Sequence, residues 1–379
     1  MKLSSKEKIR AAGLMTGTSM DGLDIVIADI CLNENVKYKL IGDTFIPYPI
    51  NLKQKIRYAV YNPLKDHYNL DDNLGKWYAD TLYNYLQSNK INNVELIGSH
   101  GQTINHISGK LSLQIGSPHY LAKKLNIPVI SDFRTADIDA GGTGAPLMPK
   151  IDEWLFRNND FSVITLNLGG IANVTFLPSD ITEDIIGFDT GPGMSLLDET
   201  YIRKFDNGFD NNGQIALKGS SDKEIVSKWL KQSYFIQSPP KSTGRDQFGI
   251  VWLDKHFKDI DKLNFEDQLA TLSFFTAKSV YLGCKKFISN HSVKKLIISG
   301  GGAHHACVIQ YLNELFDPIQ VVPSNKFDIS TDSKEALGFA FFAVANIKEI
   351  PGNIPSVSYT HLRAHETRHD LVCRLLLEK

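Results

Sequence analysis

The stretch Gly187-Phe188-Asp189-Thr190-Gly191-Pro192-Gly193 decides how this chain is interpreted. It follows the apolar pair Ile185-Ile186, which is typical of the end of a buried strand, and precedes Met194-Ser195-Leu196-Leu197, which is typical of a helix start. We therefore expect Asp189 where a strand gives way to a helix. The glycines allow the backbone to approach a ligand closely, and a helix start offers free N–H groups to an anion.

Asp189 has two interpretations in this position. As a base, it would work beside a phosphate bound at the helix start. As a structural residue, it would only cap the helix. The stretch alone leaves both open, and the rest of the chain has to decide between them.

The composition is that of an ordinary soluble protein large enough for two lobes. The chain has 379 residues, of which 42% are hydrophobic and 22% charged, and its formal net charge of -1 argues against nucleic acid or an acidic membrane as the main partner. Its four cysteines show no CxxC pairing, as is typical of reduced thiols in a cytosolic protein. No segment reaches the ~18–20 apolar residues that a membrane span needs, and the charged start lacks the apolar run of a signal peptide. We therefore expect a cytoplasmic protein.

The N-terminal half begins with a predicted antiparallel meander of strands at residues 9–16, 23–32 and 38–45. The tight turn Gly17-Thr18-Ser19-Met20-Asp21-Gly22 joins the first two strands. Backbone N–H groups and hydroxyls in such a turn can hold phosphate oxygens, but Gly-Thr-Ser turns also occur without a ligand. Both interpretations stay open on these residues alone.

Two polar residues stand out among the elements that follow. Helical patterns cover residues 52–60, 74–88 and 117–125, and strand patterns cover 94–99, 111–116 and 127–131. In the predicted loop 98–103, His100 either contacts a substrate or orders a neighbouring loop. Arg134 is the type of residue that binds an anionic or polyhydroxyl ligand through its donor fork. The glycine-rich run 140–146 predicts an active-site loop or a hinge between lobes.

A second meander repeats the pattern of the first. Strand 162–168, the turn Gly169-Gly170 and strand 171–176 are predicted to form a hairpin, with Asp189 at the end of the third strand. Two such halves are the mark of a duplicated α/β architecture with a nucleotide held in the cleft between its lobes. Helices are predicted at 195–205, 222–231, 248–256 and 265–289.

The last part of the chain contains a glycine run and a helix. The predicted strand 295–299 leads into Gly300-Gly301-Gly302-Ala303-His304, where three glycines would let a flat ring such as adenine lie against the backbone. Glu335 lies in the first turn of the predicted helix 333–347, where an acid complements the helix dipole whether or not it also binds a ligand. The chain has no GxxxxGK[ST] motif, no complete GxGxxG and no GxSxG nucleophile elbow.

Seven motifs occur in the order and at the spacing of one known family. They are GLMTGTSMDGLD (13–24), GSHGQT (98–103), SDFRTADIDAGGTGAPL (131–147), NLGGIANVT (167–175), GFDTGPG (187–193), GGGAH (300–304) and DSKEALGFA (332–340). The chain therefore resembles the anhydro-N-acetylmuramic acid kinases of bacterial cell-wall recycling over roughly residues 10–355. This resemblance implies a two-lobed actin-like ATPase fold, a duplicated ribonuclease H-like α/β fold with the nucleotide cleft between its lobes. We expect an N-terminal lobe of residues 1–140, completed by 335–357, and a C-terminal lobe of 141–334.

The resemblance also implies the reaction and its residues. Such an enzyme hydrolyses the 1,6-anhydro ring of 1,6-anhydro-N-acetylmuramic acid and phosphorylates the freed O6 with ATP, giving N-acetylmuramic acid 6-phosphate and ADP. The family motif assigns the catalytic base to Asp189. The residues implied for ATP are Gly17, Thr18, Ser19, Met20, Asp21, Gly22, Leu23, Asp24, Gly169, Gly170 and Gly191 at the phosphates, and Gly300, Gly301, Gly302 and Ala303 at the nucleoside. His100, Arg134 and Glu335 are implied for the sugar.

Further implications are Mg²⁺ and a homodimer. Mg²⁺ is expected to reach the protein mostly through phosphates and water, so we name no metal ligand. The sequence departs from the family at Met194 and His305, where the family usually has Asn, and over residues 358–379. That last segment carries His361, His365 and His369 at helical spacing, and is either a metal-binding stripe or, as we favour, a non-native extension.

Two other functions would share this ATP cleft. One is a different actin-like sugar or carboxylate kinase, which would phosphorylate another substrate. The other is a non-catalytic ATP-gated binding module like the Hsp70 nucleotide domain, in which ATP hydrolysis would be slow and independent of the sugar.

Overall fold

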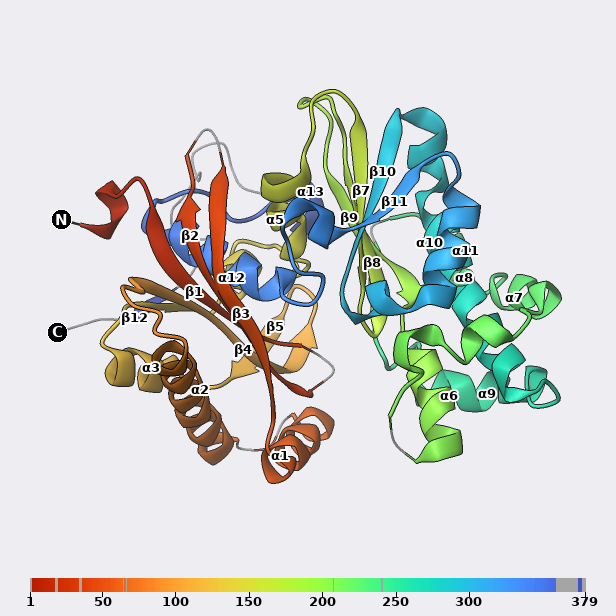
Figure 1. Ribbon diagram of the computed structural model, residues 1–379, viewed down its shortest axis with the longest axis horizontal. Coiled ribbons are helices and arrows are strands. Elements are labelled where there is room, and N and C mark those ends of the chain that lie inside the picture. The colour runs from red at the N-terminus through yellow and green to blue at the C-terminus, as the bar shows by residue number, and fades with distance from the viewer. Residues whose placement is uncertain are drawn as a thin grey trace. The chain divides into compact units, whose positions relative to one another are not determined.

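The computed structural model describes residues 2–17, 20–33, 36–63, 65, 67–206, 208–239 and 241–358, together with the backbone of 374–376. The chain divides into two compact units, Met1–Leu155 with Ser333–Lys379, and Phe156–Asp332. The first unit is therefore built from both ends of the chain. Each unit contains one β-sheet (Figure 1).

The first unit is built on a mixed sheet. Its strands are β1 (Ile9–Thr16), β2 (Gly22–Cys31), β3 (Lys37–Pro47), β4 (Leu96–Ile107), β5 (Leu111–Ile115), β6 (Val129–Ser131) and β12 (Arg374–Leu376). β1, β2 and β3 form an antiparallel meander, while β4 pairs parallel with β1, and β6 parallel with β4. β5 and β12 pair antiparallel with β4 and β6, respectively. The order β3-β2-β1-β4-β6 thus forms the body of this sheet.

Helix α12 covers the strands of this sheet. The helices of the first unit are η1 (Leu3–Ser5), α1 (Ile50–Tyr61), α2 (Tyr68–Ser88), α3 (Pro118–Leu125), α4 (Thr135–Asp139), α5 (Met148–Phe156), α12 (Lys334–Ile347) and α13 (Pro355–Ser358). α12 packs on β1, β2 and β4. Most of its residues are buried, because its sequence is apolar nearly all round and can be covered on all sides.

Two glycines let α12 lie directly on the strands. A Cβ atom on Gly13 of β1 would lie 1.8 Å from the carbonyl oxygen of Ala336. A Cβ atom on Gly98 of β4 would lie 2.0 Å from the carbonyl oxygen of Phe339. The backbones of helix and strands therefore touch without side chains between them, which fixes the depth of the helix on the sheet.

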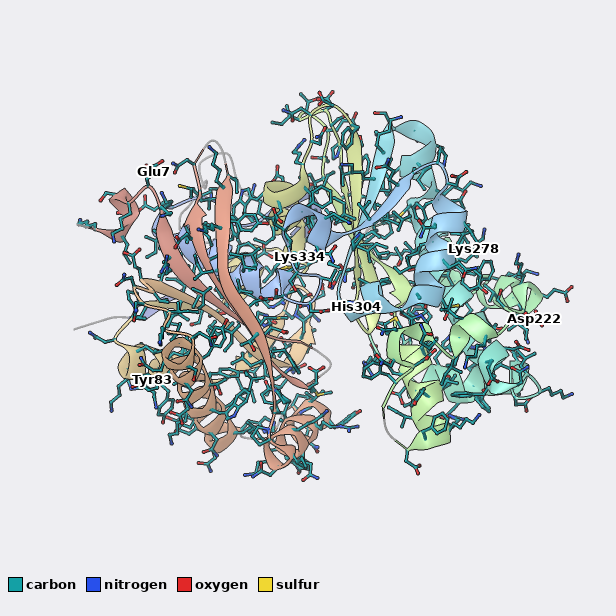
Figure 2. All side chains as sticks on the ribbon, viewed as in Figure 1. Glu7, Tyr83, Asp222, Lys278, His304 and Lys334 are labelled. Atoms are coloured by element: carbon teal, nitrogen blue, oxygen red, sulfur yellow. The ribbon has the colours of Figure 1, made fainter. Side chains whose placement is uncertain are left out.

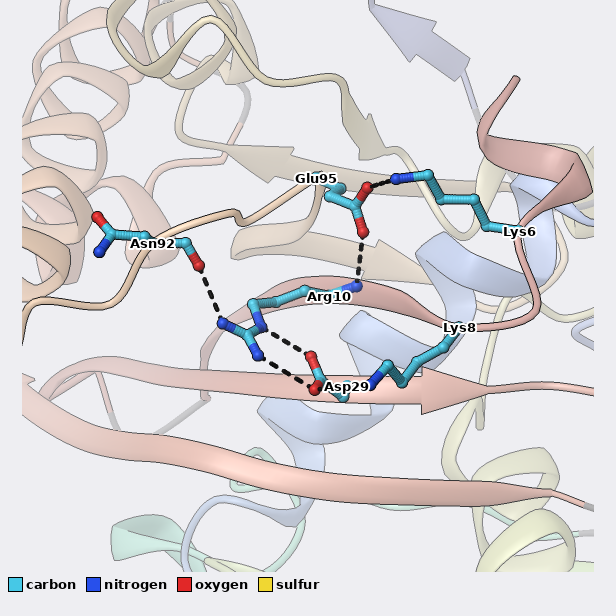
Figure 3. Close-up of polar contacts among 6 residues, drawn as sticks. All are labelled: Lys6, Lys8, Arg10, Asp29, Asn92 and Glu95. Atoms are coloured by element: carbon cyan, nitrogen blue, oxygen red, sulfur yellow. Dashed lines mark hydrogen bonds and ion pairs between the residues drawn. The ribbon is translucent and has the colours of Figure 1, made fainter. Parts of the chain in front are cut away.

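A cluster of charged side chains fixes the beginning of β1 (Figure 3). Arg10 donates to both carboxylate oxygens of Asp29 on β2, at 2.7 and 3.1 Å, and to the backbone oxygen of Asn92 at 3.0 Å. Glu95 accepts from the backbone N–H of Arg10 at 3.3 Å and pairs with Lys6. The hydrogen bonds from Arg10 hold the pKa of Asp29 below its usual value. The cluster thereby ties β1 to β2 and to the segment before β4.

The second unit has its own sheet and helices. Its strands are β7 (Ser162–Leu168), β8 (Ile171–Leu177), β9 (Ile186–Pro192), β10 (Val293–Ser299) and β11 (Gln320–Pro323). Its helices are α6 (Ser195–Phe205), η2 (Asn211–Gly213), η3 (Ala216–Lys218), α7 (Lys223–Trp229), α8 (Ser233–Ile236), α9 (Ile250–His256), η4 (Phe257–Asp259), α10 (Phe265–Asn290), η5 (Gly301–His304), α11 (Ala306–Phe316) and η6 (Ser324–Phe327). α10 packs on β8 and β9 and against α11, which closes the core of this unit.

The two sheets repeat one topology. The second sheet has the order β9-β8-β7-β10-β11, which matches β3-β2-β1-β4-β6 strand for strand. In each sheet three antiparallel strands are followed by two parallel ones. This repeat confirms the predicted duplicated α/β architecture. The predicted nucleotide cleft between the lobes stays a prediction.

Two motifs lie inside strands. The segment 98–103 was predicted as a loop, and Asp189 was predicted at the end of a strand. Residues 98–103 belong to β4, and Gly101 has a φ of 75° where the register between β1 and β4 shifts. Asp189 lies in the middle of β9 because this strand continues to Pro192. The register with β8 shifts next to Asp189, and Gly191 follows with a φ of 144°. In both places a glycine lets the strand continue through a bulge that the apolar pattern does not reveal.

The division between the units also differs from the predicted boundaries at residues 140 and 334. Residues 141–155 belong to the first unit because α5 packs on α12. Trp154 stacks on Phe341, with ring centroids 6.0 Å apart. Asp152 accepts a hydrogen bond at 2.8 Å from Lys334, and both side chains are buried (Lys334 is labelled in Figure 2).

The predicted extension 358–379 is described only in part. Residues 359–373 and 377–379, which include His361, His365 and His369, lie outside the described residues. The backbone of β12 is paired with β6. The non-native origin of this segment stays a prediction.

We expect the substitution Gly13→Ala to lower the free energy of unfolding by ~1–3 kcal/mol or more, because the new methyl group overlaps the Ala336 carbonyl and the helix has to move. Urea unfolding followed by circular dichroism measures the change. Gly301→Ala is the matched control, since a Cβ atom there meets nothing within 4 Å. Equal unfolding midpoints for the two variants would contradict the proposed close contact.

Candidate active site

The predicted site residues form two groups, one in each unit. The first unit carries the turn at 17–24 together with His100, Arg134 and Glu335. The second unit carries Asp189 together with Gly169, Gly170, Gly191 and residues 300–303. Thr18 and Ser19, which were predicted to hold phosphate, lie outside the described residues.

The turn between β1 and β2 rests on buried polar side chains. Gln102 of β4 donates its amide N–H to the backbone oxygen of Gly17 at 3.2 Å. Thr16 donates to the backbone oxygen of Gly101 at 3.0 Å, and its hydroxyl lies 3.1 Å from that of Tyr78. The backbone N–H of Met20 donates to the Gly17 oxygen at 3.2 Å. These bonds hold both ends of the turn in place.

The end of the turn leads into strand β2. The backbone oxygen of Asp21 accepts from the N–H of Tyr48 at 2.9 Å. Leu23 is 1% exposed and points into the core, and Asp24 pairs with Met15 in the sheet. Leu23 can therefore reach a ligand only through its backbone.

His100 and Arg134 are hydrogen-bonded to each other in the first unit, and the charge of Glu335 acts on Arg134. Arg134 donates through Nε and Nη2 to Nε2 of His100, at 3.1 and 3.0 Å, and through Nη1 to the backbone oxygen of Gly144 at 2.7 Å. Because Nε2 accepts from a guanidinium, the imidazole is neutral, and burial together with Arg134 lowers the pKa of His100 well below its usual value. Burial lowers the pKa of Arg134 to about 10, against the charges of Glu335 and Asp137, which raise it.

His100 also lines a cavity of about 290 Å³ within the first unit. Its wall includes Ser99, Gln114, Ser117 and Asp132. A volume near the lower end of the range for small-molecule sites, with several polar groups in its wall, is suited to a polar ligand. The cavity is compatible with the predicted contact between His100 and the sugar, which stays a prediction.

In the second unit, the glycine turn between β7 and β8 caps helix α6. The N–H of Met194 donates to the Gly169 oxygen at 2.8 Å, and the N–H groups of Gly193 and Ser195 donate to the Gly170 oxygen at 3.0 and 3.1 Å. Of these three residues only Ser195 belongs to α6, and among the described bonds none engages the N–H groups of Leu196 and Leu197, so the prediction that the helix start offers N–H groups to an anion stays a prediction. Since N–H and C=O point in opposite directions across a trans peptide, the N–H of Gly170 points away from α6. The N–H of Gly170 is therefore a further candidate for contact with an anion.

The run 300–304 packs beside this turn. A Cβ atom on Gly300 would lie 2.6 Å from Oδ1 of Asn167, and one on Gly302 would lie 2.6 Å from Cβ of Leu168. Gly301 is open, with nothing within 4 Å of a Cβ position. His304, labelled in Figure 2, ends η5 and lies 3.0 Å from a carboxylate oxygen of Asp332. The residues predicted for the nucleoside thus lie next to those predicted for the phosphates.

The two departures from the family have local explanations. His305 is the N-cap of α11, and its Nδ1 accepts from the N–H of Val308 at 3.4 Å. An asparagine oxygen would fill the same role. The sulfur of Met194 lies 2.9 Å from a Cβ position on Gly302, so this apolar side chain packs against the glycine run.

Asp189 is held by a loop from elsewhere in the second unit. Its carboxylate accepts from the backbone N–H of Thr243 at 2.8 Å, and its own N–H donates to the Lys241 oxygen at 3.1 Å. The N-cap of α6 is Met194, which excludes the interpretation of Asp189 as the cap of that helix. Burial raises the pKa of Asp189 to about 6, against the Thr243 N–H and the Lys241 charge, which lower it. A carboxylate with a pKa near neutral is suited to accept a proton.

The loop at 241–246 was not predicted as part of the site. Besides Thr243, it carries Arg245, whose Nε lies 3.1 Å from a Cβ position on Gly170. Arg245 also contacts Glu199 at 3.4 Å and Asp198 at 4.0 Å. The signal in the sequence is a polar run with a glycine and an arginine between two helices, which marks a loop but does not reveal its distant contacts.

Two further observations on the described residues concern a metal site and a membrane span. Within the described ranges, no three His, Cys, Asp or Glu side chains gather closely enough to hold a metal ion. None of the described helices has the length and apolar character to cross a membrane.

The repeated sheet, a glycine turn at the first hairpin of each half and one partly buried carboxylate agree with the duplicated α/β fold expected of an actin-like sugar kinase. Sequence comparison narrows the class. The chain belongs to the anhydro-N-acetylmuramic acid kinase family, whose profile matches residues 9–364.

Individual relatives agree with this assignment. The chain is 35% identical over 383 residues to the anhydro-N-acetylmuramic acid kinase of Salinibacter ruber, covering 94% of this chain and 95% of that protein. It is 36% identical over 365 residues to the same kinase of Clostridioides difficile, covering 92% and 94%. Among solved structures, the activator of the 2-hydroxyisocaproyl-CoA dehydratase from Clostridium difficile has a TM-score of 0.43 at 11% identity, covering 90% of this chain and 96% of that one. That likeness is too low to support a conclusion.

We expect the substitution His305→Ala to destabilise the protein by ~1 kcal/mol more than His305→Asn, because alanine removes the cap of α11 while asparagine keeps it. Chemical unfolding of both variants gives the difference directly. If the two variants unfold at the same denaturant concentration, the cap contributes nothing.

Proposed function

We propose that this chain is an ATP-dependent kinase that opens the ring of 1,6-anhydro-N-acetylmuramic acid and phosphorylates O6. The products are N-acetylmuramic acid 6-phosphate and ADP. The observation that carries the proposal is Asp189, whose pKa is raised to about 6 and whose carboxylate is fixed by Thr243 in the unit that holds the glycine turn. Membership in the kinase family supports the choice of reaction.

Asp189 is the proposed general base. It accepts a proton from water as the water oxygen bonds to the anomeric carbon, and the bond from that carbon to O6 breaks. O6 bonds to the γ-phosphorus of ATP, and the bond from this phosphorus to the bridging oxygen of ADP breaks. General-base catalysis of this type is worth typically ~10²–10⁴-fold in rate.

The remaining assignments are those that the family resemblance implies. We assign the ATP phosphates to the turn at 17–24, with Gly169, Gly170 and Gly191, and the nucleoside to residues 300–303. The direction of the Gly170 N–H and the open space at Gly301 support these assignments. We assign the sugar to His100, Arg134 and Glu335. Their clustering, and the cavity beside His100, support that choice.

We further propose that ATP acts with Mg²⁺, and that the enzyme is a cytoplasmic homodimer, as the family resemblance implies. Mg²⁺ usually keeps several water molecules and binds nucleotides through their phosphate oxygens, which needs few ligands from the protein. When bound, Mg²⁺ would neutralise charge on the phosphates. No described residue is assigned as its ligand.

Product analysis tests the proposed function. Incubation with ATP, Mg²⁺ and the anhydro sugar should yield a 6-phosphate, identified by mass spectrometry and NMR, while free N-acetylmuramic acid should yield none. A different kinase would leave the anhydro sugar unchanged. A binding module would hydrolyse ATP slowly, at a rate that the sugar does not change.

We expect the substitution Asp189→Asn to lower kcat by ~10²-fold or more while ATP affinity stays near that of the wild type, because the amide keeps the shape and removes the base. Coupled ADP release measures kcat, and calorimetry measures affinity. Asp184→Asn, at an exposed position just before β9, is the matched control and should retain full activity. Turnover of the Asp189 variant near that of the wild type would rule out the assigned role.

The activity should depend on pH through the same carboxylate. A base works only when ionised, so kcat/KM should be highest above the pKa of about 6 and fall about tenfold per pH unit below it. The substitution Lys241→Met removes a charge that lowers this pKa, and should shift the acid limb to higher pH. A limb that stays in place or moves to lower pH in this variant would contradict the assignment.

A further inference from the structure

Arg245 lies where three elements of the second unit meet. Its Nε and Nη2 atoms lie 3.1 and 3.2 Å from a Cβ position on Gly170, so a side chain at 170 would press on the guanidinium. The same guanidinium contacts Glu199 and Asp198 of α6. Two residues earlier in its loop, Thr243 binds the carboxylate of Asp189. One short loop thus connects the proposed base to the proposed phosphate turn.

The ion pairs of Arg245 are loose compared with a structural pair in the same protein. Arg10 and Asp29 form a two-pronged contact at 2.7 and 3.1 Å. Arg245 lies 3.4 Å from Glu199 and 4.0 Å from Asp198, and its side chain is 38% exposed. Strong guanidinium–carboxylate bonds are shorter than this, typically about 2.7–2.9 Å. The donors of Arg245 are therefore only weakly engaged by the two acids.

The chemistry of phosphoryl transfer gives this arginine a role. In the transition state, negative charge spreads over the three equatorial oxygens of the γ-phosphoryl group. A guanidinium is always charged and offers several donors in a plane, which suits phosphate oxygens. Arg245 lies beside the turn to which we assign the phosphates, because its guanidinium nitrogens are 3.1 and 3.2 Å from the Cβ position on Gly170.

We propose that Arg245 is a further catalytic residue, one that leaves Asp198 and Glu199 to contact the γ-phosphoryl group in the transition state. The proposal rests on the proposed function, because it places the phosphates at the Gly169-Gly170 turn. No bond in the protein forms or breaks. The guanidinium exchanges two weak carboxylate contacts for phosphate oxygens.

The competing explanation is that Arg245 only neutralises the two acids of α6. Burial raises the pKa of Asp198 to about 6, and the charge of Arg245 acts against this rise. Arg245 therefore stabilises the ionised form of Asp198 under either explanation. The two explanations differ in one respect. If Arg245 only neutralises, removing the acids together with the arginine should restore activity.

Three variants separate these explanations: Arg245→Gln, Arg245→Lys and the triple variant Asp198→Asn/Glu199→Gln/Arg245→Gln. Arg203→Gln is the matched control, since Arg203 of α6 also pairs with an acid, Asp254. We expect kcat to fall ~10²-fold or more in Arg245→Gln and in the triple variant, and less in the lysine variant, which keeps a charge. The control should keep the kcat of the wild type. Recovery of activity in the triple variant, or a loss of less than threefold in Arg245→Gln, would overturn the proposal.

A second measurement does not depend on the sugar. Binding of ADP with Mg²⁺ and aluminium fluoride, which mimics the transferred group, should be at least ~10-fold weaker in Arg245→Gln than in the wild type, while binding of ADP alone should be equal. If the wild type fails to phosphorylate the anhydro sugar but this difference is found, the proposed function is wrong and the role of Arg245 stands. Equal binding of the mimic by both proteins would overturn the role of Arg245. Thermal unfolding of each variant confirms that it is folded.

Discussion

The first unit depends on backbone contact between α12 and the strands beneath it. Gly13 and Gly98 leave no room for a side chain between β1, β4 and the helix, so the helix cannot shift without moving both strands. The same three elements carry the predicted site of this unit. β1 leads into the turn at 17–24, β4 carries His100, and the first turn of α12 carries Glu335. One close contact therefore sets the relative positions of groups that are far apart in the sequence.

The second unit arranges its site through hydrogen bonds of the backbone. The carbonyl groups of Gly169 and Gly170 accept from the N–H groups of Gly193, Met194 and Ser195 at the start of α6, and the N–H of Gly170 points away from this helix. Asp189 is fixed within β9 and bound by Thr243, so its carboxylate is held by a rigid strand and a neighbouring loop. Burial then raises its pKa towards the range in which a base is effective at neutral pH. The glycine turn and the carboxylate thus have separate structural supports.

Local sequence patterns were enough to predict the regular elements. Strands 9–16 and 162–168 and the helix 195–205 begin and end where predicted, because apolar runs bounded by polar residues or glycines define them. The pattern did not predict the position of Asp189 inside β9, since a bulge depends on the conformation of Gly191 and on pairing with β8. It also did not predict the contact of Arg245 with Gly170, nor the packing of α5 on α12. These contacts join segments distant in the sequence, and no local period encodes them.

The buried pair of Lys334 and Asp152 has a consequence for how this family can change over time. Losing Asp152 would leave the buried ammonium of Lys334 without the carboxylate to which it donates, at a cost of roughly 3–5 kcal/mol, which is a large part of the stability of a typical domain. A pair of well-packed apolar residues in the same place would carry no such penalty. Descendants of this chain can therefore exchange both residues in concert but seldom one at a time. Such paired exchanges would preserve the packing of α5 on α12 while the surrounding sequence changes, and would appear as covariation between the two positions.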